Sequence, residues 1–542
     1  MPDMIQTPLR EYALDELVLA AMLRERATTH RGQPFLAFRE GTLSFDDVHA
    51  RSNRLAQGLA ELGVSKGDHV ALMLPNCPEF VDAIFALAKL GAVAVPINIE
   101  YTAPLLHHVL ETSDATVFVT DEAYCDCFAE VRDRLPNIDG VVVRMNGTSP
   151  ESLSPHTVTL RWLADHADED PMVPVAFSDL QAIMYTSGTT GPSKGVMTPH
   201  ALALTCAIDN RRFLNGWGKT YYCPLPLFHA GGLWDGMMSA LVSGSAIGIV
   251  ERFSASRFWD DVRMFDAAVA MGVFSMIPIL LGRPASPDDK DHPLKTFYMG
   301  KSILDEPMVE RFGVHAVETY TSTEAGIPTA SPYGEWRLGS CGREHSERFK
   351  VAVVDEHDRL LPPGEPGEIV VRPRQPYVIT TGYYGCWETT AHVFRNQWFH
   401  TGDRAWCDDD GHFYFLDRIK DAIRRRGENI SAFELECQIN LHNAVLECAA
   451  IGVPSEIEEE EVKVAVVLQP GAEIQPAELA VYCDERLPAF MVPRYIEFVD
   501  ELPRTHTGKI AKHKLREMGK AGITELTLDR EDVMDQRTGT PT

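Results

Sequence analysis

"YTSGTTGPSKG", at residues 185–195, places glycine, serine and threonine residues around a single lysine. It begins where the apolar segment "LQAIMY" ends, so small residues follow a predicted buried strand. Small residues let backbone N–H groups approach an anion closely, and hydroxyl groups add donors. A Walker loop is excluded, because Ser193 stands at the second glycine position and Gly195 at the hydroxyl position. Two hypotheses remain for this stretch alone: a phosphate-binding loop of another kind, or a flexible surface linker.

On both sides of this stretch, β-branched runs such as "HVALML" alternate with amphipathic segments such as "PEFVDAIFALAKLGA". The alternation predicts a multi-domain α/β protein whose large N-terminal domain, 1–419, stacks sheets and helices and includes a β-rich subdomain. A charged loop near residue 420 indicates a domain boundary. The sequence of residues 420–520 is typical of a small α+β domain, which we expect to be mobile. The polar stretch 521–542 predicts a flexible tail.

The composition excludes several classes of protein. The chain has 542 residues, and its net charge of -28 opposes nonspecific binding to nucleic acid, which needs basic surface. We find no apolar run long enough to span a membrane and no export signal at the start. Its 11 scattered cysteines then favour reduced thiols in a cytoplasmic protein. The oligomeric state stays open, with a homodimer as one alternative.

Six segments carry a resemblance to a known superfamily. In chain order they are "YTSGTTGPSKG", "PLPLFHAGG", "YTSTEAG", "WFHTGD", "FLDRIKDAIRRRGENIS" and "LPRTHTGKIAKHKLRE". Together they closely resemble the adenylate-forming superfamily of acyl-CoA synthetases, luciferases and nonribosomal-peptide adenylation domains. The "RRRGENIS" and "TGKIAKHKLR" versions are most similar to acid:CoA ligases of the medium-chain, aryl or carnitine type.

The resemblance implies two half-reactions, in which ATP activates a carboxylic acid as an acyl-adenylate and coenzyme A then displaces AMP. The β- and γ-phosphates of ATP are expected at Thr186, Ser187, Gly188, Thr189, Thr190 and Lys194. Thr323 and Glu324 are expected at the α-phosphate, with Glu324 carrying Mg²⁺ between its carboxylate and the phosphates. A surface position is the alternative for a single glutamate.

The nucleoside half of ATP is assigned by the same resemblance. Tyr320 is expected to stack on adenine, and Asp403 and Arg418 are expected to reach the ribose hydroxyls. Ser302 and Thr321 are expected to contact the nucleotide as well. The alternatives are a helix cap or turn for Asp403 and a surface ion pair for Arg418.

The small domain is expected to alternate between two positions. Lys509 resembles the lysine that bridges the substrate carboxylate and the α-phosphate during adenylation, and Lys420 stands at the family's hinge position. Rotation about Lys420 would withdraw Lys509 and present "RRRGEN" for thioester formation. Arg425, Arg426 and Gly427 then become candidates for coenzyme A contacts, with a solvated charge run as the alternative.

The acyl pocket is expected between "FHAGG" and "YTSTEAG", with His229 as its gate or floor. The other expected pocket residues are Ala230, Gly231, Gly300, Lys301 and Ser322. Many relatives have a "GGAP" turn where this chain has "MGKSI", which puts Lys301 at a small-residue position. An inward Lys301 would need an anion, so we expect a compact polar, dicarboxylic or aromatic acid. The alternative is that Lys301 faces solvent or pairs with Asp305 or Glu306.

The predicted function is an ATP-dependent acid:CoA ligase that requires Mg²⁺ and coenzyme A. One alternative is an enzyme that loads the adenylated acid onto a carrier-protein phosphopantetheine, although the chain carries no attached carrier domain. Another is an adenylate-binding sensor without catalysis, which the presence of Glu324, Asp403 and Lys509 disfavours.

Overall fold

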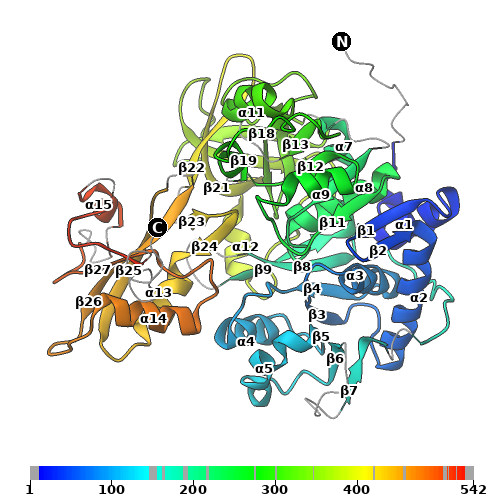
Figure 1. The fold of residues 1–542 in the computed structure, drawn as a ribbon, viewed down its shortest axis with the longest axis horizontal. Coiled ribbons are helices and arrows are strands. Elements are labelled where there is room, and N and C mark those ends of the chain that lie inside the picture. The colour runs from blue at the N-terminus through cyan, green and yellow to red at the C-terminus, as the bar shows by residue number, and fades with distance from the viewer. Residues whose placement is uncertain are drawn as a thin grey trace.

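The computed structural model of the chain comprises two α/β domains (Figure 1). The described residues are 11–145, 156–161, 165–186, 193–214, 219–273, 276–298, 302–345, 347–418, 422–455, 459–503, 510, 512–519 and 522–530. The predicted boundary falls between the segment that ends at 418 and the segment that begins at 422. Lys420 itself lies outside the described residues.

Two seven-stranded sheets form the body of the N-terminal domain. The first has the order β7 (His156–Thr159), β6 (Gly140–Arg144), β5 (Val117–Asp121), β3 (His69–Met73), β4 (Val93–Pro96), β8 (Leu180–Thr186) and β9 (Lys194–Pro199). The second has the order β14 (His315–Val317), β13 (Thr296–Tyr298), β12 (Ala267–Met271), β10 (Thr220–Cys223), β11 (Ile247–Ile249), β1 (Pro34–Phe38) and β2 (Gly41–Ser44). Both sheets are parallel apart from β9 and β2, which pair antiparallel with β8 and β1.

Helices cover these sheets and separate them. They are α1 (Leu19–Thr29), α2 (Phe45–Glu61), α3 (Pro78–Leu90), α4 (Ala103–Thr112), α5 (Cys125–Ala129), α7 (His200–Leu214), η4 (Gly231–Met238), α8 (Ser239–Ser243), α9 (Phe258–Met264), α10 (Met276–Leu281), α11 (Asp305–Phe312) and α12 (Trp387–Val393). Short 3-10 turns lie at Leu14–Glu16, Glu122–Tyr124, Arg132–Arg134 and Ser302–Leu304.

Helix α3 lies at the centre of the N-terminal core. Pro78 suits its first turn, Gly91 ends it in the left-handed conformation, and each residue from 80 to 90 is buried. Its sequence is mostly apolar, as expected for a helix packed between layers. The one buried cation in it, Lys89, is satisfied by Ser52 Oγ at 2.7 Å and by the His49 carbonyl at 2.8 Å.

A third layer of short antiparallel sheets completes the N-terminal domain and corresponds to the predicted β-rich subdomain. Its strands are β15 (Thr319–Ser322), β16 (Gly326–Ala330), β17 (Arg343–Glu344), β18 (Phe349–Val354), β19 (Gly367–Pro373), β20 (Phe394–Arg395), β21 (Trp398–Cys407) and β22 (Phe413–Arg418). The predicted fold class, with a large α/β domain, a β-rich part and a small second domain, is confirmed.

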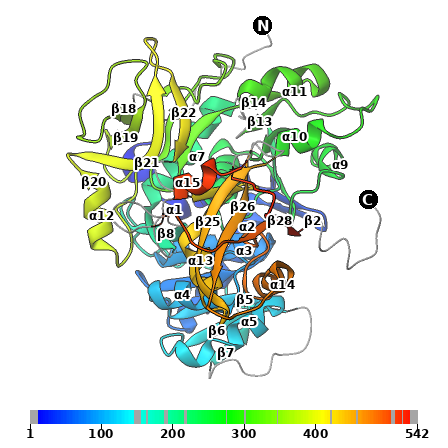
Figure 2. The same ribbon diagram turned by 90° about the vertical axis from the view of Figure 1, so that its left-hand side faces the viewer.

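The small domain has its own core and lies beside α4 (Figures 1 and 2). Its elements are β23 (Ala422–Arg425), β24 (Glu428–Ser431), α13 (Ala432–Asn440), β25 (Val445–Pro454), β26 (Glu460–Leu468), α14 (Pro476–Arg486), β27 (Tyr495–Phe498), α15 (Lys512–Glu517) and β28 (Leu528–Asp529). Thr102 Oγ1 donates a hydrogen bond of 2.6 Å to the Arg486 carbonyl, and Leu105 joins the small domain's core.

Residues 522–530 differ from the predicted flexible tail. Strand β28 pairs antiparallel with β27, and the buried Lys463 ammonium donates to the Gly522 carbonyl and to Glu497. The hydroxyls of Thr524 and Thr527 donate to the same Glu497 carboxylate, at 2.7 and 2.9 Å. A polar sequence is ordered here because a buried ion pair needs its hydrogen-bonding groups.

None of the described helices has both the length and the apolar character that crossing a lipid bilayer requires.

Candidate active site

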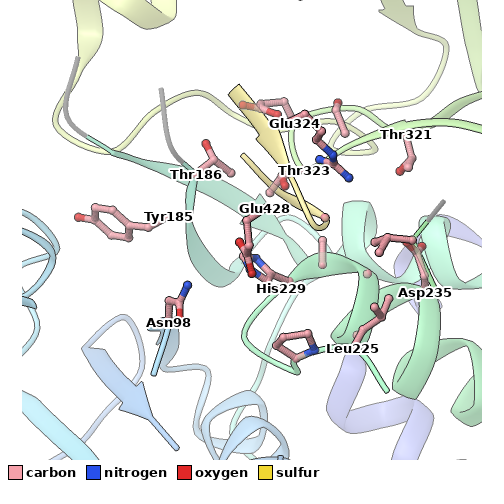
Figure 3. Close-up of a pocket in the computed structure, with 18 of the residues that line it drawn as sticks. Asn98, Tyr185, Thr186, Leu225, His229, Asp235, Thr321, Thr323, Glu324 and Glu428 are labelled. Atoms are coloured by element: carbon pink, nitrogen blue, oxygen red, sulfur yellow. The ribbon is translucent and has the colours of Figure 1, made fainter. Parts of the chain in front are cut away.

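A cavity of about 720 Å³ opens between the two domains (Figure 3). Its floor consists of segments that follow the carboxyl ends of parallel strands in both large sheets. Asn98 follows β4, Leu225 follows β10, Val273 follows β12, and Thr186 ends β8. Ligands of α/β proteins bind at this edge, because the loops that leave parallel strands converge there.

The expected phosphate side of the cavity brings three predicted residues together. Thr186 and Lys194 face each other across the β8–β9 pair, and both line the cavity. The Lys194 ammonium lies 5.9 Å from the ring centre of Tyr383, whose hydroxyl donates to Glu324 Oε1 at 3.0 Å. Ser187, Gly188, Thr189 and Thr190 lie outside the described residues.

Glu324 lies in the turn between β15 and β16, and its position is set by backbone as well as side chain. Its carbonyl accepts from the Thr380 N–H at 2.6 Å, while Thr380 Oγ1 bonds the Met197 carbonyl on β9 at 2.8 Å. No group of three or more metal-binding side chains is found in the described part of the chain. A single carboxylate still fits Mg²⁺, which proteins hold through one or two carboxylates plus the phosphates of the substrate.

The expected ribose side is organised around Asp403 on β21. Asp403 is 4% exposed, lines the cavity, and accepts a hydrogen bond of 2.6 Å from the Tyr320 hydroxyl. Tyr320 is itself buried, with its ring packed near Phe415, so its observed contact orients Asp403. The predicted stacking of Tyr320 on adenine stays a prediction. Arg418 pairs with Asp403 in the β21–β22 register, and its side chain lies outside the described structure.

Sequence reasoning missed the support beneath Asp403. Glu368 on β19 accepts from His400 Nδ1 at 2.8 Å and from the Gly402 N–H at 2.9 Å. Burial opposes ionisation of Glu368, but these bonds and the nearby charges hold its pKa below the ordinary value. The charged Glu368 thus fixes the backbone that leads into Asp403. Glu368 lies 30 residues before the start of the "WFHTGD" segment, so no local pattern identifies it.

The expected acyl side begins at His229 and continues along the π-helical turn η4. The Leu233 N–H bonds the His229 carbonyl at 2.9 Å, so His229 stands at the start of that helix. Ala230, Gly231 and Gly232 follow it along the cavity wall. Gly232 is required by packing, because a Cβ there would lie 2.2 Å from the Pro226 carbonyl oxygen.

The small domain reaches the same wall through the hairpin of β23 and β24. Glu428 Oε1 and Oε2 lie 3.0 and 2.9 Å from His229 Nε2, an ion pair between the two domains (Figure 3). Burial would raise the pKa of Glu428, but His229 and Arg424 hold it below the ordinary value. Gly427, at the hairpin tip, lies so close to Val273 that a Cβ would stand 2.9 Å from it. The sequence pattern did not assign Glu428 a role, although it stands within "RRRGENIS".

Two sequence-level matches decide the family. Residues 23–384 match the family described as AMP-binding enzyme, and residues 434–509 match the AMP-binding enzyme C-terminal domain. The chain belongs to the AMP-binding enzyme family.

Curated relatives and solved structures of this family cover nearly the whole chain. A crotonobetaine/carnitine–CoA ligase of Salmonella typhimurium is 33% identical over 490 residues, covering 87% of this chain and 93% of the relative. An o-succinylbenzoate CoA synthetase from Bacillus subtilis, with a product analogue bound, has a TM-score of 0.79 at 25% identity and covers 92% of this chain and 98% of its own. ATP-bound MatB from Rhodopseudomonas palustris has a TM-score of 0.66 at 26% identity, with coverage of 92% and 98%.

These similarities confirm the predicted superfamily and class of enzyme. The chain is an AMP-forming acyl-CoA ligase, a class that uses ATP, Mg²⁺ and coenzyme A. Within this AMP-binding enzyme, the cavity brings together Thr186, Lys194, His229, Ala230, Gly231, Thr321, Ser322, Thr323, Glu324, Asp403, Arg426 and Gly427. Gly300, Lys301 and Lys509 lie outside the described residues.

Three predicted residues of the AMP-binding enzyme whose side chains are described do not line the cavity: Arg425, Ser302 and the buried Tyr320. Arg425 is 5% exposed, and its guanidinium bonds the Val492 carbonyl at 2.8 Å and pairs with Glu461 at 2.7 Å. The Arg425 side chain is thus used inside the small domain in this structure, and its coenzyme A contact stays a prediction. Arg426, with a side chain 60% exposed, lines the cavity instead. Ser302 is buried, its hydroxyl donates to Glu318 at 2.7 Å and accepts from the Gly339 N–H at 2.8 Å, and its nucleotide contact stays a prediction.

Proposed function

We propose that this chain is an ATP-dependent carboxylic acid:CoA ligase that joins a compact polar acid to coenzyme A. The acid's carboxylate attacks the α-phosphate of ATP, which forms an acyl-adenylate and releases pyrophosphate. The coenzyme A thiol then attacks the acyl carbon, which forms the thioester and releases AMP. The observation that carries this proposal is one continuous cavity that joins Glu324 and Asp403 to the His229–Glu428 contact between the domains.

In the first half-reaction, the chain supplies positioning and neutralises charge on phosphoryl oxygens, and it needs no covalent nucleophile. Thr186 and Lys194 would hold the β- and γ-phosphates, and the loop between them would release pyrophosphate. Asp403, held by Tyr320, would accept hydrogen bonds from the ribose. Mg²⁺, held by Glu324, would neutralise phosphate charge. Lys509 would bridge the acid's carboxylate and the α-phosphate, as the family resemblance implies.

In the second half-reaction, the hairpin of β23 and β24 would border the path of the pantetheine thiol. Gly427 leaves the hairpin tip without a side chain at its closest approach to Val273. Arg426 is exposed at the cavity and could meet the phosphates of coenzyme A. Glu428 draws His229 toward the hairpin, which supports a position of the small domain suited to thioester formation. Rotation about Lys420 would then restore Lys509 to the site for the next adenylation.

The identity of the acid is the finer part of the proposal. The curated relatives are ligases named for crotonobetaine and carnitine, which supports a compact polar acid. The dicarboxylic or aromatic alternative depends on an inward Lys301, which lies outside the described residues. An acid panel separates these possibilities.

The test is release of pyrophosphate from ATP with a panel of compact acids, diacids and aromatic acids, with and without coenzyme A. We expect release with at least one compact polar acid, and a thioester only when coenzyme A is present. No release with any acid would defeat the proposal. Release without a coenzyme A thioester would favour carrier loading or a sensing role.

The lysine assigned to adenylation provides an internal control. Lys509→Ala should abolish pyrophosphate release but keep thioester formation from supplied acyl-adenylate. Lys514→Ala removes an exposed lysine from α15 in the same basic run and should leave both steps unchanged. Equal loss in the two variants would contradict the role of Lys509.

A further inference from the structure

A histidine on α4 contacts the strand that carries Lys194. His108 Nε2 lies 3.0 Å from the carbonyl oxygen of Ser193, the residue directly before β9 begins at Lys194. A carbonyl oxygen only accepts hydrogen bonds, so the ring nitrogen is the donor. Because Ser193 is buried, water does not readily replace this donor. His108 lies 85 residues before Ser193 and outside all six motif segments, so the family resemblance gave it no role.

The same helix contacts the neighbouring strand β8 through Thr112. Thr112 Oγ1 donates to the His108 carbonyl at 2.7 Å, which uses the only proton of this hydroxyl. The Tyr185 hydroxyl, 2.8 Å away, therefore donates to Thr112 Oγ1. The rings of His108 and Tyr185 also meet edge to face, with their centres 6.4 Å apart. The end of α4 thus holds Tyr185, the residue directly before Thr186.

Strands β8 and β9 place the held residues next to the expected phosphate ligands. Tyr185 pairs with Gly195, and Thr186 pairs with Lys194. The side chains of Tyr185 and Thr186 leave the strand in different directions, as alternation along a strand requires (Figure 3). A Cβ on Gly195 would lie 3.2 Å from the Tyr185 ring, so this ring packs closely on β9. Fixing Tyr185 and Ser193 therefore fixes where Thr186 and Lys194 enter the cavity.

Accurate placement of Lys194 matters for the chemistry. Charge that develops on phosphoryl oxygens is stabilised by donors that are already in position. A misplacement of 1 Å costs up to about 10²-fold in rate. Strand β9 is the last strand of its sheet, and the hydrogen bond from His108 adds a constraint from outside that sheet.

We propose that His108 is a positioning residue for adenylation, which holds the backbone before Lys194 so that its ammonium meets the phosphates of ATP. This rests on the proposed function, in which Thr186 and Lys194 hold the β- and γ-phosphates. His108 is not among the described residues that line the cavity, so it acts through the Ser193 carbonyl. Pyrophosphate has left before coenzyme A reacts, and the role of His108 is therefore confined to the first half-reaction.

Three substitutions of His108 separate positioning from a general structural role. His108→Gln keeps an N–H donor at about the reach of Nε2, His108→Asn places its amide nearer the backbone, and His108→Ala removes the donor. With the preferred acid, we expect kcat/KM for ATP in pyrophosphate release to fall at least about tenfold in the Ala and Asn variants and to stay within about threefold in the Gln variant. Thioester formation from supplied acyl-adenylate should stay within about twofold in all three.

The neighbouring histidine provides a matched control. His107→Ala removes a ring from the same turn of α4 that faces Glu111, 3.6 Å away, and should leave both half-reactions unchanged. Equal losses in the Gln and Asn variants, or equal losses in both half-reactions, would show a structural role and overturn the proposal. If the His108 variants do not fold, Thr112→Val and Thr112→Ser test the same contact, and only the valine should lower kcat/KM for ATP.

Binding of Mg²⁺–ATP without any acid separates this inference from the proposed function. Calorimetry should show weaker binding by at least about tenfold in His108→Ala and His108→Asn but not in His108→Gln. Unchanged binding and unchanged pyrophosphate release in all three variants would overturn the role of His108 and leave the ligase assignment intact. If no acid supports pyrophosphate release, the ligase assignment fails, and the binding of Mg²⁺–ATP alone then decides whether His108 positions Lys194.

Discussion

At the scale of single residues, the site consists of side chains that the motifs predicted and partners that they did not. Six segments in a fixed order resemble one superfamily, and this resemblance predicted one shared site. The cavity confirms that four of these residues lie together: Thr186, Lys194, Glu324 and Asp403. Their supporting partners come from distant strands and loops, as Tyr383 does for Glu324. Such partners depend on tertiary packing, which local sequence does not encode.

Glu324→Gln should lower the rate of pyrophosphate release by about 10²- to 10³-fold, the scale for loss of one electrostatic contact in the transition state. Because the metal is proposed to act on ATP, thioester formation from supplied acyl-adenylate should change far less. Tyr383→Phe, which removes only the hydroxyl on Glu324, is the matched control for lost orientation. Equal effects on both half-reactions would contradict the assigned role of Glu324.

The pH dependence of stability should report the buried carboxylate of Asp235 on η4, which forms no ion pair with an arginine or lysine in the described part of the chain. Its folded pKa of about 7 exceeds the ordinary value of 3.8, so the folded enzyme binds more protons than the unfolded chain between these values. Stability relative to Asp235→Asn should therefore fall as pH rises from about 4 to about 7, by up to roughly 4 kcal/mol. Melting temperatures of both proteins across this range measure the change. If the melting temperatures of the two proteins change with pH in parallel, the claim that Asp235 is a buried carboxylate without a positive partner would be contradicted.

At the scale of elements, the strands and helices follow from sequence patterns more closely than the contacts between them. The β-branched runs and Gly91 predict strands and a helix end, because these are local preferences. The burial of Arg425 was not predictable, since its partners Phe490, Val492 and Glu461 lie at least 36 residues away. The order of residues 522–530 was not predictable either, because their partners on β27 and at Glu497 are also distant in the sequence.

The hairpin of β23 and β24 makes a prediction at this scale. Gly427→Ala adds a methyl group 2.9 Å from Val273 at a φ of +85°. Because this contact is too short and the backbone is strained, the hairpin should move away from Val273. Thioester formation should slow by at least about tenfold, while pyrophosphate release stays within about twofold, as expected for a contact used in one position of the domain. Gly471→Ala has a similar φ of +81° with open space around it, and it controls for backbone strain alone. Equal slowing of both steps would contradict a hairpin specific to the second step.

At the scale of the whole molecule, the small domain is stabilised by its own core and by residues 522–530. Within this domain, the Lys463 ammonium donates to the Gly522 carbonyl, and the Thr524 and Thr527 hydroxyls donate to Glu497. In the described part of the chain, the polar contacts of the small domain with the N-terminal domain include His229–Glu428 and Thr102–Arg486. This arrangement suits a domain that is expected to move as one body.

Truncation after residue 521 should destabilise the small domain by about 4–9 kcal/mol, because it removes three hydrogen bonds to a buried ion pair, each contributing about 1.5–3 kcal/mol. Truncation after residue 530 keeps β28 and the Glu497 contacts, and it is the matched control. Thermal unfolding of the two proteins measures the difference. An unchanged melting temperature after the longer truncation would contradict the role given to residues 522–530.

The central claim, that one cavity carries both adenylation and thioester formation, is tested most directly by counting products with and without coenzyme A. Enzyme, Mg²⁺–ATP and the preferred acid are mixed, and pyrophosphate, AMP and acyl-CoA are measured. The account predicts about one pyrophosphate per enzyme without coenzyme A, and repeated turnover with equal pyrophosphate, AMP and thioester when it is added. Repeated pyrophosphate release that coenzyme A does not accelerate, with no thioester formed, would contradict it.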